Sequence, residues 1–272
     1  MNLLTRGRGF ADGHDVRLNV NKLEIQLERT GSVESDAGPA ILFIHGAGGD
    51  PSIWAAQAYD LGKRRLVYRM ALPGHGDSAG TGAGEIHAYA QWVRMTLDAL
   101  GSQIPLLVVG HSMGGAIALE LALDPPSLMK GAVVVSSGAK LAVSPDIFEM
   151  LQNDPPSFFQ FMERNAFALT TPREIRDPII LAMRRCPPSL IHDDFQACHR
   201  FDIRSRLEEI QLPTLIICGD EDRLTPVGYS EYLLEHITGS RLRVISQAGH
   251  MVMAEQPAPL NQAIEKFIKD LL

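Results

Sequence analysis

The sequence predicts an α/β protein built on a mostly parallel β-sheet. Three observations carry this: apolar runs of strand length recur along the chain, amphipathic helical segments separate them, and the runs are continuously apolar rather than alternating. Continuous apolar runs are typical of strands that are buried on both faces, as parallel strands are. The 272 residues, 45% of them hydrophobic, are enough for one large core.

The elements follow one another in a regular order. Alternation of apolar and polar residues predicts an opening β-hairpin or pair of strands over 16–26 and 27–30, followed by a polar loop at 31–39. Hydrophobic periodicity then predicts strands at 40–44, 65–70, 104–109, 131–136, 212–218 and 242–246, and helices near 51–61, 85–100 and 114–123.

The alternation of strands and helices stops between residues 139 and 205. Apolar residues there fall at helical spacing and predict several short helices, which prolines interrupt at 145, 155, 156, 172, 178, 187 and 188. The aromatic and methionine side chains of this stretch either form its own core or line an apolar pocket, and the two roles are compatible. The apolar positions are Phe148, Met150, Leu151, Phe158, Phe159, Phe161, Met162, Phe167 and Leu169.

A serine stands at the predicted turn from the strand at 104–109 into the helix at 114–123. The segment Gly110–Gly114 reads Gly-His-Ser-Met-Gly, the pattern of a nucleophile elbow. Glycines two residues before and after the serine leave room where strand and helix approach, so that the turn exposes the hydroxyl. Ser112 is therefore a candidate nucleophile.

A serine nucleophile needs a base, and the base needs an orienting acid. In the fold that carries this elbow, the acid and then the histidine follow later strands of the chain. The predicted strand at 212–218 leads into Gly219-Asp220-Glu221-Asp222, and the strand at 242–246 leads into Gly249-His250. The sequence thus offers His250 as the base, with Asp220, Glu221 or Asp222 as the acid.

These motifs together resemble the α/β-hydrolase superfamily over about residues 40–135 and 205–272. Beside the elbow and the two downstream turns, His45-Gly46-Ala47-Gly48 is similar to the family's oxyanion loop, and Leu72–Ser78, read Leu-Pro-Gly-His-Gly-Asp-Ser, is similar to the loop after its next strand. Ala71 departs from the aspartate that the family often has before that loop. Because this aspartate is not catalytic, the departure leaves the triad assignment unchanged.

The resemblance implies a catalytic group and a domain organisation. Ser112 is the implied nucleophile and His250 the base, and Asp222 is preferred over Asp220 because the family's acid falls three residues after the glycine that ends the strand. The backbone N–H groups of Ala47 and Met113 are the implied oxyanion donors. The family's fold is an eight-stranded, mostly parallel sheet flanked by helices, with a core at 1–138 and 206–272 and a helical lid at 139–205.

The expected activity is hydrolysis of carboxylic esters, or of thioesters with the same parts, of small to medium apolar acyl groups through an acyl-enzyme. A carbon–carbon bond hydrolase of a meta-cleavage-type diketone, with a lid arginine for the substrate carboxylate, stays open as an alternative. So does a non-catalytic ligand-binding protein of the same fold.

Composition argues against other classes. The net charge of −7 without a basic run argues against nucleic acid, and the longest apolar runs are too short for a membrane span. Residues 1–9 hold no signal-peptide stretch, and three cysteines without framework spacing favour a cytoplasmic protein. His192, Asp193, Asp194, Cys198 and His199 match no zinc spacing, so neither metal nor cofactor is expected. The expected partner is a small-molecule ester, and the expected state is a monomer or homodimer.

Overall fold

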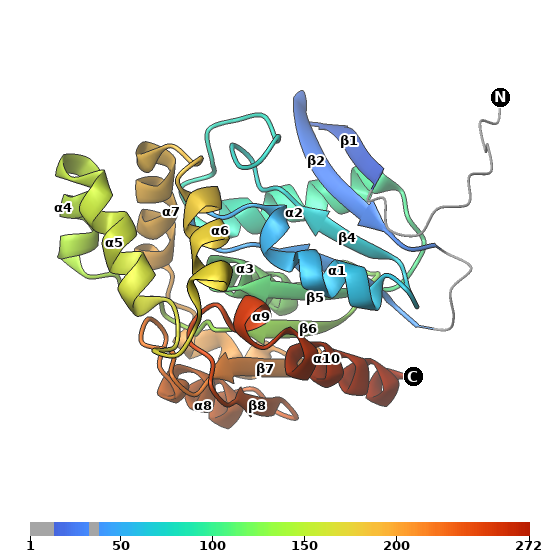
Figure 1. Cartoon of the computed structure of the whole chain (residues 1–272). Helices are drawn as coiled ribbons and strands as arrows, with labels where there is room; N and C mark the ends of the chain where they lie inside the picture. The colour runs from blue at the N-terminus through green and yellow to red at the C-terminus, as the bar shows by residue number, and fades with distance from the viewer. Residues whose placement is uncertain (1–13, 33–37) are drawn as a thin grey trace.

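Eight strands form one mixed sheet in the computed structural model, which describes residues 14–32 and 38–272 (Figure 1). Their spatial order is β1-β2-β4-β3-β5-β6-β7-β8. All neighbours from β4 to β8 pair in parallel, whereas β2 is antiparallel to both β1 and β4. The strands are β1 (His14–Val20), β2 (Leu23–Thr30), β3 (Ala40–Ile44), β4 (Val67–Met70), β5 (Leu106–His111), β6 (Met129–Val135), β7 (Thr214–Gly219) and β8 (Arg241–Ile245). The predicted fold class is confirmed.

The opening hairpin turns earlier than the sequence predicted. The break lies at Asn21 and Lys22, not between residues 26 and 27. Both turn residues have positive φ, 48° and 68°, which matches the right-handed twist of the flanking strands in a two-residue hairpin turn. The sequence does carry a signal there, because the apolar positions change from even numbers up to Val20 to odd numbers from Leu23 onward, and the prediction overlooked this change of phase.

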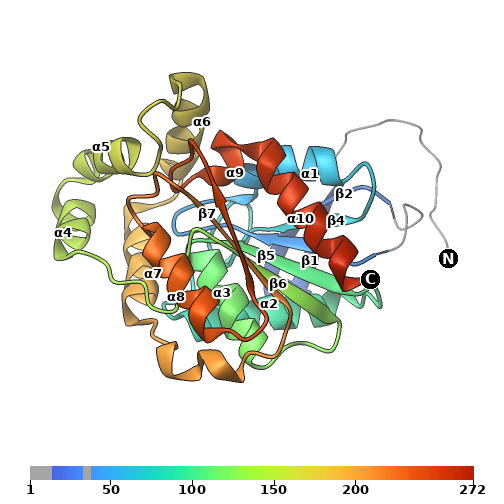
Figure 2. The same cartoon turned by 90° about the horizontal axis from the view of Figure 1, so that it is seen from below.

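Helices cover both faces of the sheet (Figure 2). One face carries α1 (Ala55–Leu61), preceded by the short helix η1 (Pro51–Trp54), together with α9 (Val252–Glu255) and α10 (Pro257–Leu271). The other face carries α2 (Ile86–Leu100), α3 (Met113–Leu123) and α8 (Val227–His236).

Strand β5 shows why the central strands read as continuous apolar runs. Leu106 and Val108 pack into the apolar core on one face of the sheet, and Leu107 and Val109 pack into the core on the other. Each of these side chains is at most 1% exposed. Burial on both faces places the end of β5, and with it Ser112, at the centre of the sheet.

The segment between β6 and β7 forms four helices that lie together past one end of the sheet (Figure 1). They are α4 (Pro145–Asn153), α5 (Pro155–Asn165), α6 (Arg173–Met183) and α7 (Pro188–Arg200), and the short helix η2 (Arg204–Glu209) follows. We call α4–α7 the inserted helices. Their two chain ends meet, since the N–H of Ile203 donates to the carbonyl of Ala139 at 2.9 Å.

Two sequence predictions within the inserted helices are wrong. Pro178 does not interrupt a helix but lies inside α6. Pro178 is the sixth residue of α6, and the bond that it cannot donate is the one to the carbonyl of Glu174, an exposed residue. Leu169 does not share the helical spacing of the other apolar residues: it follows α5 in a turn, and it is 80% exposed.

Over residues 14–32 and 38–272, no helix is long and apolar enough to cross a membrane. The prediction that residues 1–9 carry no signal peptide lies outside the described residues.

Candidate active site

Ser112 occupies the sharp turn between β5 and α3. Its backbone has φ 53° and ψ −115°, a conformation that a non-glycine residue seldom adopts and that the surrounding packing must enforce. The turn is fixed on both sides. The Ser112 N–H donates to the carbonyl of Val135 at 2.9 Å, and its carbonyl accepts from the hydroxyl of Ser137 at 2.8 Å.

The elbow glycines are required by close backbone approach. A β-carbon on Gly110 would lie 1.9 Å from the carbonyl oxygen of Gly114, and one on Gly114 would lie 2.5 Å from the carbonyl oxygen of Ile44. Neither contact is possible without moving a strand of the central sheet. The Gly-x-Ser-x-Gly spacing is therefore a steric requirement of this turn.

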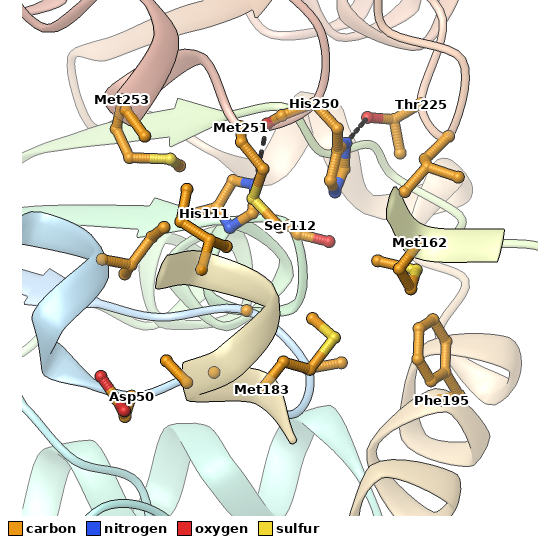
Figure 3. A pocket seen from close by; sticks show the side chains of 18 of the residues that line it. Asp50, His111, Ser112, Met162, Met183, Phe195, Thr225, His250, Met251 and Met253 are labelled. Atoms are coloured by element: carbon orange, nitrogen blue, oxygen red, sulfur yellow. Dashed lines mark hydrogen bonds between the residues drawn. The ribbon is translucent and has the colours of Figure 1, made fainter. Parts of the chain in front are cut away.

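His250 and Asp222 are brought together by the loops after β8 and β7. The Nδ1 atom of His250 lies 2.9 Å from Oδ2 and 3.1 Å from Oδ1 of Asp222, and the residues are 3% and 5% exposed. With the Nδ1–H donating to the carboxylate, the acceptor lone pair of a neutral ring lies on Nε2. Figure 3 shows the Ser112 hydroxyl pointing into the cavity beside the His250 ring.

Asp222 is held ionised by its surroundings. Its Oδ1 accepts from the N–H groups of Leu224 and Thr225 at 2.9 Å each, and its Oδ2 accepts from the hydroxyl of Thr225 at 2.8 Å. Burial alone would raise the pKa of Asp222, but the charge and hydrogen bond of His250 and the hydrogen bonds of Thr225 lower it to about 2. The carboxylate therefore stays charged over the whole neutral range.

Asp220 faces elsewhere. It is exposed, and its Oδ1 accepts from the N–H of Ala248 at 3.4 Å. Glu221 accepts from the N–H of Leu169 at 3.2 Å. Of the three carboxylates that the sequence offered, it is Asp222 that contacts His250.

Buried groups hold the main chain around His250. The Nε2–H of His111 donates to the His250 carbonyl at 3.0 Å (Figure 3), and burial lowers the pKa of His111 well below its ordinary value, so this ring is neutral. On the other side, the carboxylate of Glu255 accepts from the N–H of Gly249 at 2.9 Å and from the N–H of Ala168 at 2.7 Å. The histidine loop is thus fixed both to β5 and to the chain between α5 and α6.

The two predicted oxyanion residues lie at the ends of neighbouring strands. Ala47 follows β3 and lines the cavity, while Met113 opens α3 with its side chain fully buried. Because first-turn N–H groups of a helix have no intrahelical partner, the N–H of Met113 is at a position suited to bind an anion.

An apolar cavity of about 610 Å³ opens over Ser112 and His250. This volume lies within the range of small-molecule sites. All four inserted helices contribute to its wall, with Ile147 from α4, Phe161 and Met162 from α5, Ile179 and Met183 from α6, and Phe195 from α7. Met162, Met183 and Phe195 stand around the Ser112 hydroxyl in Figure 3.

The aromatic and methionine side chains of residues 139–205 therefore fill both roles that the sequence left open. Phe161 and Met162 line the cavity, whereas Phe158 and Phe167 are buried in the apolar core, at 0% and 1% exposure.

Three functional contacts escaped the sequence. Thr225 bonds both Asp222 and, at 3.2 Å, the Nδ1 of His250; a hydroxyl three residues after the acid is a local signal that could have indicated it. Glu255 bonds the N–H of Ala168, 87 residues away, and Asp194 accepts from the N–H of Gly48, 146 residues away, and no local signal exists for contacts at such separations. Within the described residues, no cluster of three or more histidine, cysteine or acidic side chains is arranged to hold a metal ion.

Comparison with known proteins places the chain among related sequences and structures. The model of the alpha/beta hydrolase family matches residues 41–263. A pimeloyl-[acyl-carrier protein] methyl ester esterase of Neisseria meningitidis serogroup C / serotype 2a is 29% identical over 229 residues, which cover 79% of this chain and 88% of that protein.

Solved structures give the same result. A thermophilic esterase superposes with a TM-score of 0.84 at 32% identity, covering 95% of this chain and 98% of that one. Est816, described as an N-acyl homoserine lactone degrading enzyme, superposes with a TM-score of 0.82 at 28% identity, covering 93% and 100%. The chain belongs to the alpha/beta hydrolase family.

Proposed function

We propose that this protein is a serine hydrolase that cleaves carboxylic esters of small to medium apolar acids through an acyl-enzyme. One observation carries the proposal: Ser112 and the buried His250–Asp222 pair meet at an apolar cavity that also contains Ala47. The names of the relatives, which include esterases at 29% and 32% identity, support the same reaction class.

The residues have separate roles in two half-reactions. His250 Nε2 takes the proton of the Ser112 hydroxyl as Oγ attacks the ester carbonyl, and it then gives that proton to the leaving alcohol. In the second half-reaction His250 takes a proton from a water molecule as that water attacks the acyl-enzyme, and it returns the proton to Ser112 Oγ as the acid is released. Asp222 orients the ring and stabilises its charged form in both. A thioester would react in the same way, with a thiol leaving.

The oxyanion of each tetrahedral intermediate would be held by the N–H groups of Ala47 and Met113. Both follow the ends of adjacent strands, and the positive end of α3 adds to the field at that point. We further propose that residues 139–205 act as a lid over the core at 1–138 and 206–272, because all four inserted helices wall the cavity.

A carbon–carbon bond hydrolase acting on a diketone acid is less well supported. Such a substrate needs a cation for its carboxylate, and Arg223 is the one arginine among the described residues that line the cavity. Its guanidinium already donates to the carbonyl of Phe167 at 2.7 Å. A non-catalytic ligand-binding protein has no need of the triad contacts, and covalent labelling of Ser112 by a fluorophosphonate would contradict that alternative.

Hydrolysis of p-nitrophenyl esters from acetate to decanoate tests the function. Because each buried methylene contributes about 0.8 kcal/mol, or roughly fourfold, we expect kcat/KM to rise from acetate by about 10-fold to an optimum near four carbons, or by about 10³-fold to an optimum near eight. Beyond the optimum it should fall as the cavity is filled. Turnover of dienoate diketones with no ester turnover would contradict the proposal.

Narrowing the cavity should shift this optimum. Ala182 lies on α6 and lines the cavity, so Ala182→Phe is expected to move the optimum to a shorter chain by about two to four carbons, since a benzyl group displaces a few methylenes. The matched control is Leu181→Phe, at the neighbouring position, which is 57% exposed. It should keep the parental chain-length profile. The same shift in both variants would show that the change does not come from the cavity.

On the acid side of the pH profile, activity should depend on a single protonation. Because the pKa of Asp222 is about 2, its carboxylate is charged throughout pH 4–8, and protonation of the histidine base alone removes activity there. We expect log kcat/KM to rise with pH at a limiting slope of about one, and activity to recover fully after neutralisation. A flat profile between pH 5 and 8, with chemistry limiting, would mean that His250 is not the base.

A further inference from the structure

A buried carboxylate joins the inserted helices to the loop that contains Ala47. Asp194 of α7 is 0% exposed. It accepts three hydrogen bonds, from the N–H of Gly48 at 2.8 Å, from Nε2–H of His75 at 2.8 Å and from the hydroxyl of Tyr89 at 2.6 Å. The three donors come from three separate segments of the core, so one side chain of the insertion holds them together.

The contact between Asp194 and His75 is an ion pair. Burial alone would lower the pKa of His75, but the charge and hydrogen bond of Asp194 raise it to about 10. A carboxylate is kept in the interior only when it is paired and hydrogen-bonded, and Asp194 meets both conditions. Its Oδ2 is the atom shared by Gly48 and His75, so the position of the Gly48 N–H depends on the ion pair.

Helix α7 also fits Gly48 sterically. This glycine has φ +62°, and a β-carbon on it would lie 2.9 Å from Cγ1 of Ile191, which is one turn before Asp194 on the same helix. The loop conformation after Ala47 is therefore set by α7 through a packing contact as well as through a hydrogen bond.

The other side of Ala47 is fixed by His45. Burial and the nearby charge of His75 lower the pKa of His45 to about 3, so the ring is neutral. Its Nδ1–H donates to the carbonyl of Gly46 at 2.8 Å, and its Nε2 accepts from the N–H of Leu72 at 3.1 Å. The peptide groups before and after Ala47 are thus held by two polar side chains.

We propose that Asp194 is a positioning residue for the oxyanion hole: by holding the Gly48 N–H it orients the N–H of Ala47, and it does so only when α7 is seated on the core. The inference rests on the proposed serine hydrolase function. Asp194 is not among the described residues that line the cavity, and its effect passes through the loop from Gly46 to Gly48. Seating of the inserted helices and assembly of the oxyanion hole are then one event.

The test compares Asp194→Asn with Asp193→Asn. Asp193 is the adjacent residue, its side chain is 56% exposed, and the change removes the same charge. For each variant we would measure kcat and KM with p-nitrophenyl butyrate, the inhibition constant of heptyl trifluoromethyl ketone, and the melting temperature. The ketone forms a tetrahedral adduct with serine, so its affinity reports the oxyanion hole directly.

We expect Asp194→Asn to lower kcat by about 10- to 100-fold, less than the loss of an entire oxyanion donor, with KM within about threefold of the parent. Affinity for the ketone should fall by the same factor as kcat/KM. Asp193→Asn should leave kcat, KM, the ketone affinity and the melting temperature unchanged. An Asp194→Asn enzyme with parental kcat, or one whose KM rises while kcat and ketone affinity are kept, would overturn the inference.

A second variant decides the question if Asp194→Asn does not fold. Tyr89→Phe removes one of the three donors and leaves the ion pair and the ring in place. We expect kcat and ketone affinity to fall together by about threefold or more at an unchanged KM, and unchanged values would overturn the inference. A parental enzyme without esterase activity would instead refute the proposed function, because that result does not depend on Asp194.

Discussion

Ser112→Ala is expected to lower kcat/KM for p-nitrophenyl butyrate by about 10³-fold or more, because no other group can form the acyl-enzyme. The fold should persist, since alanine keeps the β-carbon and the backbone hydrogen bonds to Val135 and from Gly115 do not involve the hydroxyl. Steady-state kinetics and circular dichroism of the same preparation check both statements. Near-parental turnover by a folded variant would refute the mechanism.

Ser136→Ala is the matched control. Ser136 follows the neighbouring strand β6 and has φ 48°, close to the 53° of Ser112, yet it is not among the described residues that line the cavity. The Ser136→Ala enzyme should keep kcat/KM within about threefold of the parent, and a fluorophosphonate should still label its Ser112. The contrast separates loss of a nucleophile from loss of a hydroxyl in a strained turn.

Asp222→Asn should lower kcat by roughly 10²- to 10⁴-fold. The structure explains the direction of this effect. Two backbone N–H groups donate to Oδ1, so the amide oxygen will take that place and the NH₂ group will face Nδ1 of His250. An N–H donor at this point favours the tautomer with its proton on Nε2, which cannot accept the proton of Ser112. Burst kinetics should show that acylation is slowed.

Asp220→Asn provides the comparison for the acid. It removes the same charge two residues away, from an exposed side chain that bonds Ala248. We expect activity within about threefold of the parent. A larger loss from Asp220→Asn than from Asp222→Asn would assign the orienting acid to Asp220.

Local features were predictable because their causes are local. The turn at Ser112 is dictated by glycines two residues to either side, and the central strands are continuous apolar runs because both of their faces are buried. Asp222 and His250, the proposed acid and base, could be placed for a related reason: each follows a strand, and parallel strands end at the same edge of the sheet.

Long-range contacts were not predictable in this way. Asp194 and Gly48 are 146 residues apart. In the sequence, Asp194 drew attention only as one of several possible metal ligands, and that interpretation was rejected because the spacing matches no zinc site. Pro178 misled because a proline inside a helix removes one hydrogen bond without always ending the helix, and here the carbonyl that loses its donor belongs to the exposed Glu174. The hairpin turn at Asn21 was misplaced for another reason: the apolar positions change from even to odd numbers between Val20 and Leu23, and this local signal was overlooked.

Because the chain enters and leaves the inserted helices at neighbouring points, Ala139 and Ile203, these helices form an exchangeable segment of the fold. The two ends are already joined by a hydrogen bond of 2.9 Å, so a segment of another length between them would leave β6 and β7 at their present spacing. The entropy of closing such a loop grows only with the logarithm of its length. Such grafts offer a route to new substrate ranges on one core. Each donor segment must, however, supply its own buried acceptor for the N–H of Gly48.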